Sequence, residues 1–153
     1  MLGTTSEHAL RALAHMASLP EGSTILGRNL AKSANIPANY LSKILWALGN
    51  AGIIDATRGS GGGYRLRKPA QDIHLVEVVE LFDKPQPKRA CFMGGRECSE
   101  TDPCAAHGAW KQVRACYQNF LESTTVADLA EQSNRKQNEP VTTKTRRSGA
   151  KSR

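Results

Sequence analysis

The feature that most constrains the fold is a pair of short helical patterns followed directly by two β-type segments around a run of glycines. Apolar residues at helical spacing predict one helix over 27–34 and a second over 37–48, with only a short turn between them. Residues 53–58 and 64–67 have the pattern of strands, and the glycine-rich stretch 59–63 suits the tip between them. Two helices joined by so short a turn, followed by a hairpin, predict a winged helix-turn-helix.

The rest of the chain adds helices before and after this unit. Apolar stripes predict helices over 9–17 and 75–82, a longer helix over 104–122 and a final short helix over 126–132. We therefore expect a mainly α fold, in which a winged helix-turn-helix domain with a small β-hairpin wing is joined to a long C-terminal helix.

The chain divides into four segments. Residues 1–82 form the expected winged-helix domain, 83–103 a cysteine-containing loop, and 104–132 the long helix and the short one. Residues 133–153 are polar, basic and without aromatic residues, and we expect this tail to be disordered.

Charge is distributed unevenly along these segments. The net charge is −4 over residues 69–133, against +5 over 1–68 and +6 over 134–153, giving +7 in total. A basic first block is typical of a nucleic-acid face. No stretch reaches the roughly 20 apolar residues that span a membrane, and the N-terminus lacks the features of a secretory signal, so we expect a cytoplasmic protein.

Double-stranded DNA is the partner that this pattern favours. The second helix of such a module enters the major groove, and cations on the first helix contact phosphates. Glycines at the wing tip let the protein backbone approach DNA closely, and Arg58 there suits the narrow minor groove. The alternative is that these residues are only solvated polar groups on a helical domain. The candidate DNA contacts are Arg28, Lys32, Asn39, Ser42, Lys43, Arg58, Gly59 and Ser60.

The loop carries three of the four cysteines in the chain within fourteen residues. Cys91, Cys98 and Cys104 are followed three residues later by His107. In a reducing compartment, thiolates beside an imidazole favour a transition metal or an iron–sulfur cluster. Zinc, a thiol switch and a cluster carrier remain open, although zinc sites usually contain the tight Cys-x-x-Cys spacing that is absent here. Cys116 flanks the apolar stripe of the long helix, and we expect it to be a small buried residue rather than a ligand.

Enzymatic chemistry is not indicated. The sequence has no arrangement of nucleophile, base and acid, and the glycines at 59–63 lie between strands without the lysine that a phosphate loop needs. The protein is therefore expected not to be an enzyme.

Three segments carry a family resemblance. Residues 5–11 (Thr-Ser-Glu-His-Ala-Leu-Arg), 36–43 (Ile-Pro-Ala-Asn-Tyr-Leu-Ser-Lys) and 58–65 (Arg-Gly-Ser-Gly-Gly-Gly-Tyr-Arg) resemble those of the Rrf2 family of bacterial transcription regulators. The three-cysteine loop and the segment 125–129 extend the resemblance to about residues 1–132.

The resemblance implies a homodimer that binds a roughly palindromic operator and whose long helix is the dimerisation helix. It also implies an iron–sulfur cluster on the three cysteines, which senses redox state, nitric oxide, iron or cluster supply. With His107 as fourth ligand the site is similar to that of the family's iron–sulfur cluster regulator and implies [2Fe–2S]. Glu7 is the alternative fourth ligand, because it matches the carboxylate position of the family's nitric-oxide sensor, which holds [4Fe–4S]. We expect [2Fe–2S] over [4Fe–4S].

Overall fold

The computed structural model describes residues 2–59, 61–83, 91–92 and 99–131. The predictions for Ser60, for Cys98 and for the basic tail lie outside these residues. Within them, no helix is long and apolar enough to cross a membrane.

The described part of the chain is mainly helical with one hairpin, as the apolar patterns predict. Its elements are α1 (Thr4–Ala17), α2 (Gly27–Ser33), α3 (Ala38–Asn50), β1 (Ile54–Thr57), β2 (Gly63–Leu66), the 3-10 turn η1 (Ala70–Asp72), α4 (Leu75–Phe82) and α5 (His107–Ser123). Residues 126–131 form a further short helix.

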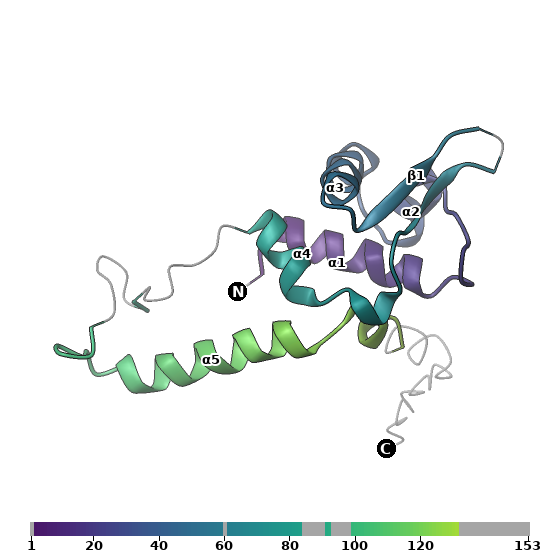
Figure 1. The fold of residues 1–153 in the computed structure, drawn as a ribbon. Coiled ribbons are helices and arrows are strands. Elements are labelled where there is room, and N and C mark those ends of the chain that lie inside the picture. Colours follow the sequence, from purple (N-terminus) through teal and green to yellow (C-terminus); the bar gives the residue numbers. More distant parts are fainter. Residues whose placement is uncertain (1, 60, 84–90, 93–98, 132–153) are drawn as a thin grey trace, which may run out of the picture.

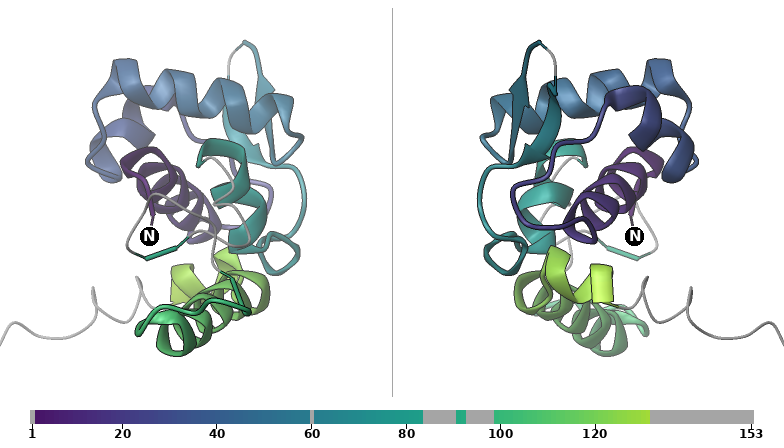
Figure 2. Two further views of the ribbon diagram at one scale, coloured as in Figure 1. Left: turned by 90° about the vertical axis from the view of Figure 1, so that its left-hand side faces the viewer. Right: turned by 90° about the vertical axis from the view of Figure 1, so that its right-hand side faces the viewer.

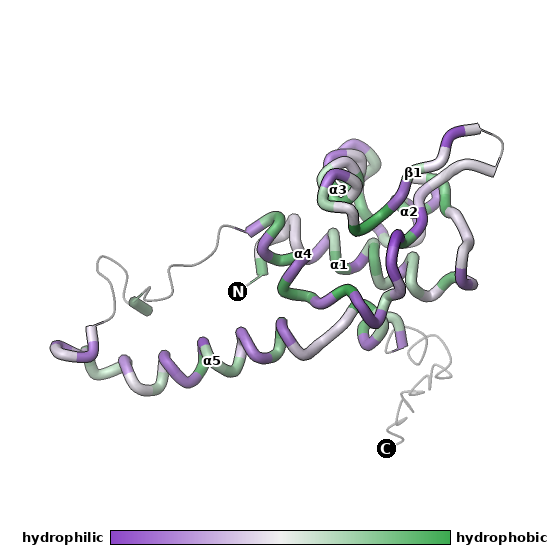
Figure 3. The backbone as a smooth tube through the Cα atoms, viewed as in Figure 1, coloured by the Kyte–Doolittle hydropathy of each residue, from purple (hydrophilic) through white to green (hydrophobic). Residues whose placement is uncertain are grey.

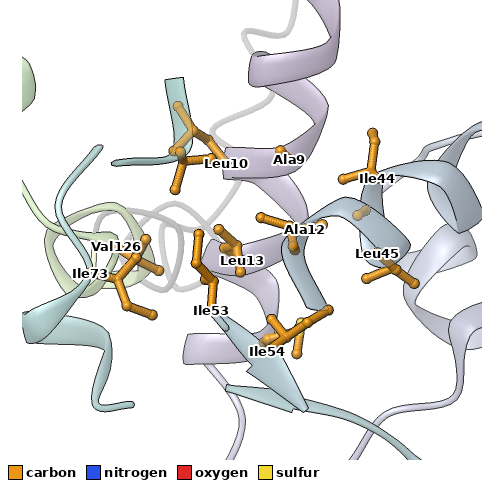
Figure 4. Close-up of a cluster of buried hydrophobic side chains, with 14 of the residues drawn as sticks. Ala9, Leu10, Ala12, Leu13, Ile44, Leu45, Ile53, Ile54, Ile73 and Val126 are labelled. Carbon is orange, nitrogen blue, oxygen red and sulfur yellow. The ribbon is translucent and has the colours of Figure 1, made fainter. Parts of the chain in front are cut away.

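The elements place the helix-turn-helix and the long helix on opposite sides of the molecule. α3 and the hairpin lie at one side, α1 and α4 lie between, and α5 lies at the other side (Figures 1 and 2). The buried apolar face of α1 packs against α3 and α4, and this core includes the residues labelled in Figure 4: Ala9, Leu10, Ala12, Leu13, Ile44, Leu45, Ile53, Ile54, Ile73 and Val126.

The turn between α2 and α3 is fixed by backbone geometry. Asn35 has a φ of +53°, a left-handed conformation that asparagine tolerates better than most residues. The backbone N–H of Ile36 then donates to the carbonyl of Ala31 at 2.9 Å, and the Ile36 side chain is buried. The chain thus reverses within a few residues, which orients α3 across α2.

The wing is an antiparallel pair in which Ile54 lies opposite Leu66 and Thr57 opposite Gly63. Ile25 adds a bridge to Tyr64 on the other side of β2, with N···O distances of 2.9 and 2.8 Å. Gly63 has a φ of +154°, and a Cβ atom there would lie 2.7 Å from the Ile25 carbonyl oxygen. Only glycine lets the wing lie this close to the strand-like segment before α2.

The chain after α5 returns to the winged-helix domain. The backbone N–H of Leu75 donates to the Thr124 carbonyl at 3.0 Å, and that of Val126 donates to the Ile73 carbonyl at 2.9 Å. The side chains of Ile73, Leu75 and Val126 are all buried. The C-terminal end of α5 is therefore part of the same core as α1 and α3.

Two expectations about the long helix are wrong. It begins at His107 rather than at Cys104, because Cys104 to Ala106 form a turn whose last hydrogen bond runs from the His107 N–H to the Cys104 carbonyl at 3.0 Å. Cys116 is exposed rather than buried, because α5 packs on the core through Leu121, which is buried, and Tyr117, which is partly buried. Apolar and polar residues alternate along α5 in Figure 3.

Candidate nucleic-acid interface and cysteine loop

The exposed face of α3 carries the residues predicted to read DNA. Asn39, Ser42 and Lys43 are all exposed there. The Asn39 side-chain oxygen accepts the Tyr40 N–H at 2.9 Å, and the Ser42 hydroxyl donates to the Asn39 carbonyl at 2.8 Å. The Asn39 amide N–H₂ therefore remains as a donor for a ligand, and the Ser42 oxygen and the second lone pair of the Asn39 oxygen remain as acceptors.

Trp46 lies on the same face and was not among the predicted contacts. Its relative exposure of 73% is the highest among the exposed large hydrophobic residues of the described chain. One helical turn before and after Trp46 lie Ser42, Lys43, Gly49 and Asn50, all exposed and none with a large apolar side chain. The sequence contained this placement outside the apolar stripe of α3.

The two cations of α2 are also exposed. Arg28 and Lys32 are separated by one helical turn, so they project from the same face of α2. The distance and angle to α3 are set by the packing of Leu30 and Ala31 against the core. This arrangement places positive charge beside α3, the helix predicted to enter the major groove and called the recognition helix below. Such charges contact phosphates and do not read bases.

Arg58 and Gly59 are exposed at the end of β1. Gly59 has a φ of +98°, and the Gly62 N–H donates to its carbonyl at 2.9 Å, which closes the tip of the hairpin. The Thr24 hydroxyl donates to the Gly61 carbonyl at 3.0 Å. The wing tip is thus fastened to the segment before α2, and it projects from the domain beside α3 (Figures 1 and 2).

Tyr40 is half-buried and packs against the core, as its place in the apolar stripe indicates. Its hydroxyl lies 2.5 Å from the Thr5 hydroxyl of α1. The ring of His8 meets the Tyr40 ring edge-on, with 5.4 Å between centroids. The start of the recognition helix is therefore attached to the first turns of α1.

Two of the three predicted cysteine ligands fall within the described residues. Cys91 and Cys104 are half-buried, and His107, also half-buried, is the first residue of α5. Phe92 is in ring contact with Trp110, with 5.3 Å between centroids. Because Trp110 lies three residues after His107, this contact brings the chain beside Cys91 to the N-terminal end of α5.

Within the described residues of a single chain, the candidate ligands do not come together into one metal site. No group of three or more His, Cys, Asp or Glu side chains that could hold a metal occurs among the described residues. Glu7 is exposed and pairs instead with Arg11 at 2.6 Å, one turn along α1. Thiols and an imidazole are the donor types that iron–sulfur clusters take, and Cys91, Cys104 and His107 supply these types among the described residues.

Asp83, at the start of the loop, interacts with the segment before α1 and with α5. Its carboxylate accepts the Gly3 N–H at 2.9 Å, and a Cβ atom on Gly3 would lie 2.4 Å from that carboxylate. Burial and the negative charge of Asp83 raise the pKa of Tyr117, which belongs to α5. The first residue of the loop therefore accepts a hydrogen bond from the chain just before α1, and its charge acts on Tyr117 of α5.

Comparison with known proteins decides the family. Residues 2–132 match the Rrf2 family, described as an iron-dependent transcriptional regulator. The chain belongs to the Rrf2 family. It is 31% identical over 127 residues to an HTH-type transcriptional regulator of Aquifex aeolicus (strain VF5), covering 82% of this chain and 88% of that one. This Rrf2 protein is thus a DNA-binding transcriptional regulator and not an enzyme.

Solved structures of the family share this fold. Staphylococcus aureus CymR is 28% identical, with a TM-score of 0.67 over 84% of this chain and 97% of that chain. T. potens IscR is 18% identical, with a TM-score of 0.71 over 92% and 93% of the two chains. CymR of B. subtilis, the global cysteine regulator, is 23% identical, with a TM-score of 0.72 over 86% and 97%. The mainly α winged-helix prediction is confirmed.

Proposed function

We propose that this Rrf2 protein is a cytoplasmic regulator whose operator affinity depends on an iron–sulfur cluster held by Cys91, Cys98 and Cys104. The observation that carries the proposal is the Phe92–Trp110 contact, which brings the Cys91 segment to the helix end where Cys104 and His107 lie. When bound, the cluster supplies a centre that reacts with oxidants or nitric oxide.

His107 is the proposed fourth ligand, and [2Fe–2S] the proposed cluster. His107 is the first residue of α5, and its backbone N–H donates to the Cys104 carbonyl, so the two residues belong to one turn of the chain. Glu7 is the alternative fourth ligand, but a ligand role would require it to leave the ion pair with Arg11. Because that exposed pair stabilises the chain by only about 0–1 kcal/mol, the ion pair by itself does not exclude Glu7.

The homodimer is proposed to form along α5. Ala109, Val113, Cys116 and Phe120 are exposed at spacings of four, three and four residues, which is the pattern of a helix–helix seam. Val113 is 56% exposed and Phe120 48% exposed in one chain. A second copy of α5 would cover this strip and place two winged helices on two half-sites of a palindromic operator.

Regulation is proposed to act through the two ends of the loop. Thiols bound to a common group would tie the cysteine loop to the start of α5, while Asp83 accepts the Gly3 N–H and Phe92 contacts Trp110 of α5. A change at the loop then alters how the two winged helices are presented to DNA. Coupling between two such sites typically amounts to about 1–3 kcal/mol, or a 5- to 150-fold change in operator affinity.

Anaerobic purification followed by absorbance, iron and acid-labile sulfide assays tests the cluster. The wild-type protein should be brown and contain iron and sulfide, and Cys91→Ser and Cys104→Ser should lose both. Cys116→Ser is the matched control and should keep them, since Cys116 lies outside the proposed ligand set.

The fourth ligand and the regulation need separate measurements. His107→Ala should change the absorbance and electron paramagnetic resonance spectra, whereas Glu7→Gln should leave them unchanged. Operator affinity, measured by fluorescence anisotropy, should differ at least five-fold between the apo and the loaded protein. A colourless protein that contains zinc, or equal affinity in the two forms, would contradict the proposal and favour a zinc or thiol-switch regulator.

A further inference from the structure

The exposure of Trp46 is not explained by the packing of α3. Its indole is 73% exposed, although α3 has a fully apolar inner face with Leu41, Ile44 and Leu48 almost completely buried. The ring contacts found in the described residues do not include Trp46. Single exposed apolar side chains are common on soluble proteins, so the place of Trp46 on the surface, and not its exposure alone, decides whether it meets a ligand.

The position of Trp46 on α3 identifies that ligand. At 100° per residue, Trp46 lies about 20° from Asn39 around the helix axis, seven residues further along. Ser42 and Lys43 are on either side of the line that joins them. The indole therefore belongs to the same face as the polar residues that face the major groove in a winged helix-turn-helix, and the surrounding charge from Lys43 and from α2 is positive.

The distance along the helix favours the DNA backbone over the base edges. Seven residues at 1.5 Å per residue place Trp46 about 10 Å beyond Asn39. The major groove is about 12 Å wide, and recognition helices contact base edges mainly with their N-terminal residues. With Asn39 over the bases, Trp46 reaches the sugar–phosphate chain at the side of the groove.

We propose that Trp46 is a DNA-contacting residue that packs on the deoxyribose–phosphate wall of the major groove. The apolar face of the indole covers the sugars, and its Nε1–H can donate to a phosphate oxygen, because indole nitrogen is a donor only. A contact of this kind positions the protein and carries no sequence information. The inference rests on the proposed DNA interface and adds a residue to it.

The test compares two duplexes. One is a duplex enriched by the wild-type protein from a randomised library, and the other is an unselected duplex of equal length. Trp46→Ala should weaken binding to both by about ten-fold, because a backbone contact is shared by all sequences. Leu2→Ala, which removes a side chain 40% exposed before α1, is the matched control and should leave both affinities unchanged.

Fluorescence gives an independent measurement, because the chain has only two tryptophans. In Trp110→Phe, Trp46 is the single indole, and saturating duplex should change its emission. Unchanged emission with bound DNA, unchanged affinity in Trp46→Ala, or a loss confined to the selected duplex would overturn the proposal. Failure of the wild-type protein to bind any duplex would instead contradict the DNA interface itself. Equal thermal midpoints for Trp46→Ala and wild type exclude a folding defect, as expected for an exposed side chain.

Discussion

The hydrogen bond between the Thr5 and Tyr40 hydroxyls makes a defined prediction about how α1 holds the recognition helix. It spans 2.5 Å between two half-buried side chains that are 35 residues apart in the sequence. A side-chain hydrogen bond contributes about 0.5–1.5 kcal/mol to the free energy of unfolding. We therefore expect Tyr40→Phe, which removes only the hydroxyl, to destabilise the protein by about 1 kcal/mol.

Thr5→Val should have a similar effect, because valine keeps the shape of threonine and removes the hydroxyl. Each single change leaves the other hydroxyl without its partner, so the double variant should be little less stable than either single variant. The coupling energy between the two positions should then be about 1 kcal/mol, within the range for residues in direct contact. The ring contact between His8 and Tyr40 is kept in all three variants, since phenylalanine retains the ring.

The assay is urea unfolding of apo protein, followed by far-ultraviolet circular dichroism at one fixed protein concentration, because dimer stability depends on concentration. Tyr40→Phe combined with Ser33→Ala is the control cycle. The Ser33 hydroxyl bonds only the Asn29 carbonyl of its own helix, so those effects should add. Additive effects for Thr5→Val and Tyr40→Phe would refute the assigned bond.

Three further outcomes follow from individual residues. Burial raises the pKa of Glu77, but hydrogen bonds from Lys68 and from a backbone N–H more than offset this effect and lower the pKa. The ionised Glu77 therefore stabilises the folded protein above about pH 4.3, the pKa of an unperturbed glutamate. This stabilisation should be lost as the pH falls through the lower pKa of the folded state. Thermal midpoints measured across pH 3–7 check this, and Lys68→Met should flatten the decline. Gly63→Ala should lower the free energy of unfolding, measured in urea, by about 1–3 kcal/mol, because the Gly63 φ of +154° suits glycine alone. Gly49→Ala is the control: Gly49 has open space around it, so this change should be neutral or stabilising. Phe120→Glu should shift the protein towards monomer in sedimentation velocity, since it places a charge in the proposed α5 seam; an unchanged dimer would argue for another interface.

Most of the winged helix was predictable because its signals are local. The apolar spacing of α3, the short turn before it and the glycines between the two strands each specify a conformation over a few residues. The start of α5 was not predictable in the same way. Pro103 suits the entrance of a helix, but the chain makes a further turn before His107, and sequence patterns define helix ends less sharply than helix interiors.

The errors at the candidate site have a common physical origin. Cys116 flanks the apolar stripe, so the sequence predicted a buried residue. In the structure α5 buries Leu121 and, in part, Tyr117, and Cys116 stays exposed. Trp46 was missed because it lies outside the apolar stripe of α3, and its exposure could not be read from that stripe. Exposure depends on which elements pack together, and that information is tertiary.

The contacts of α1 give the loop a physical connection to the recognition helix. The Gly3 N–H donates to Asp83, the first residue of the loop. Thr5, two residues after Gly3, bonds the hydroxyl of Tyr40. Both contacts lie at the N-terminal end of α1, where the chain packs on the same core as α3 and α4. A change in the loop that moved Asp83 would therefore pull on the same end of α1 that holds Tyr40. The Thr5–Tyr40 cycle, measured in apo and in loaded protein, distinguishes this route from one through α5: if the coupling energy is the same in both states, α1 does not carry the signal.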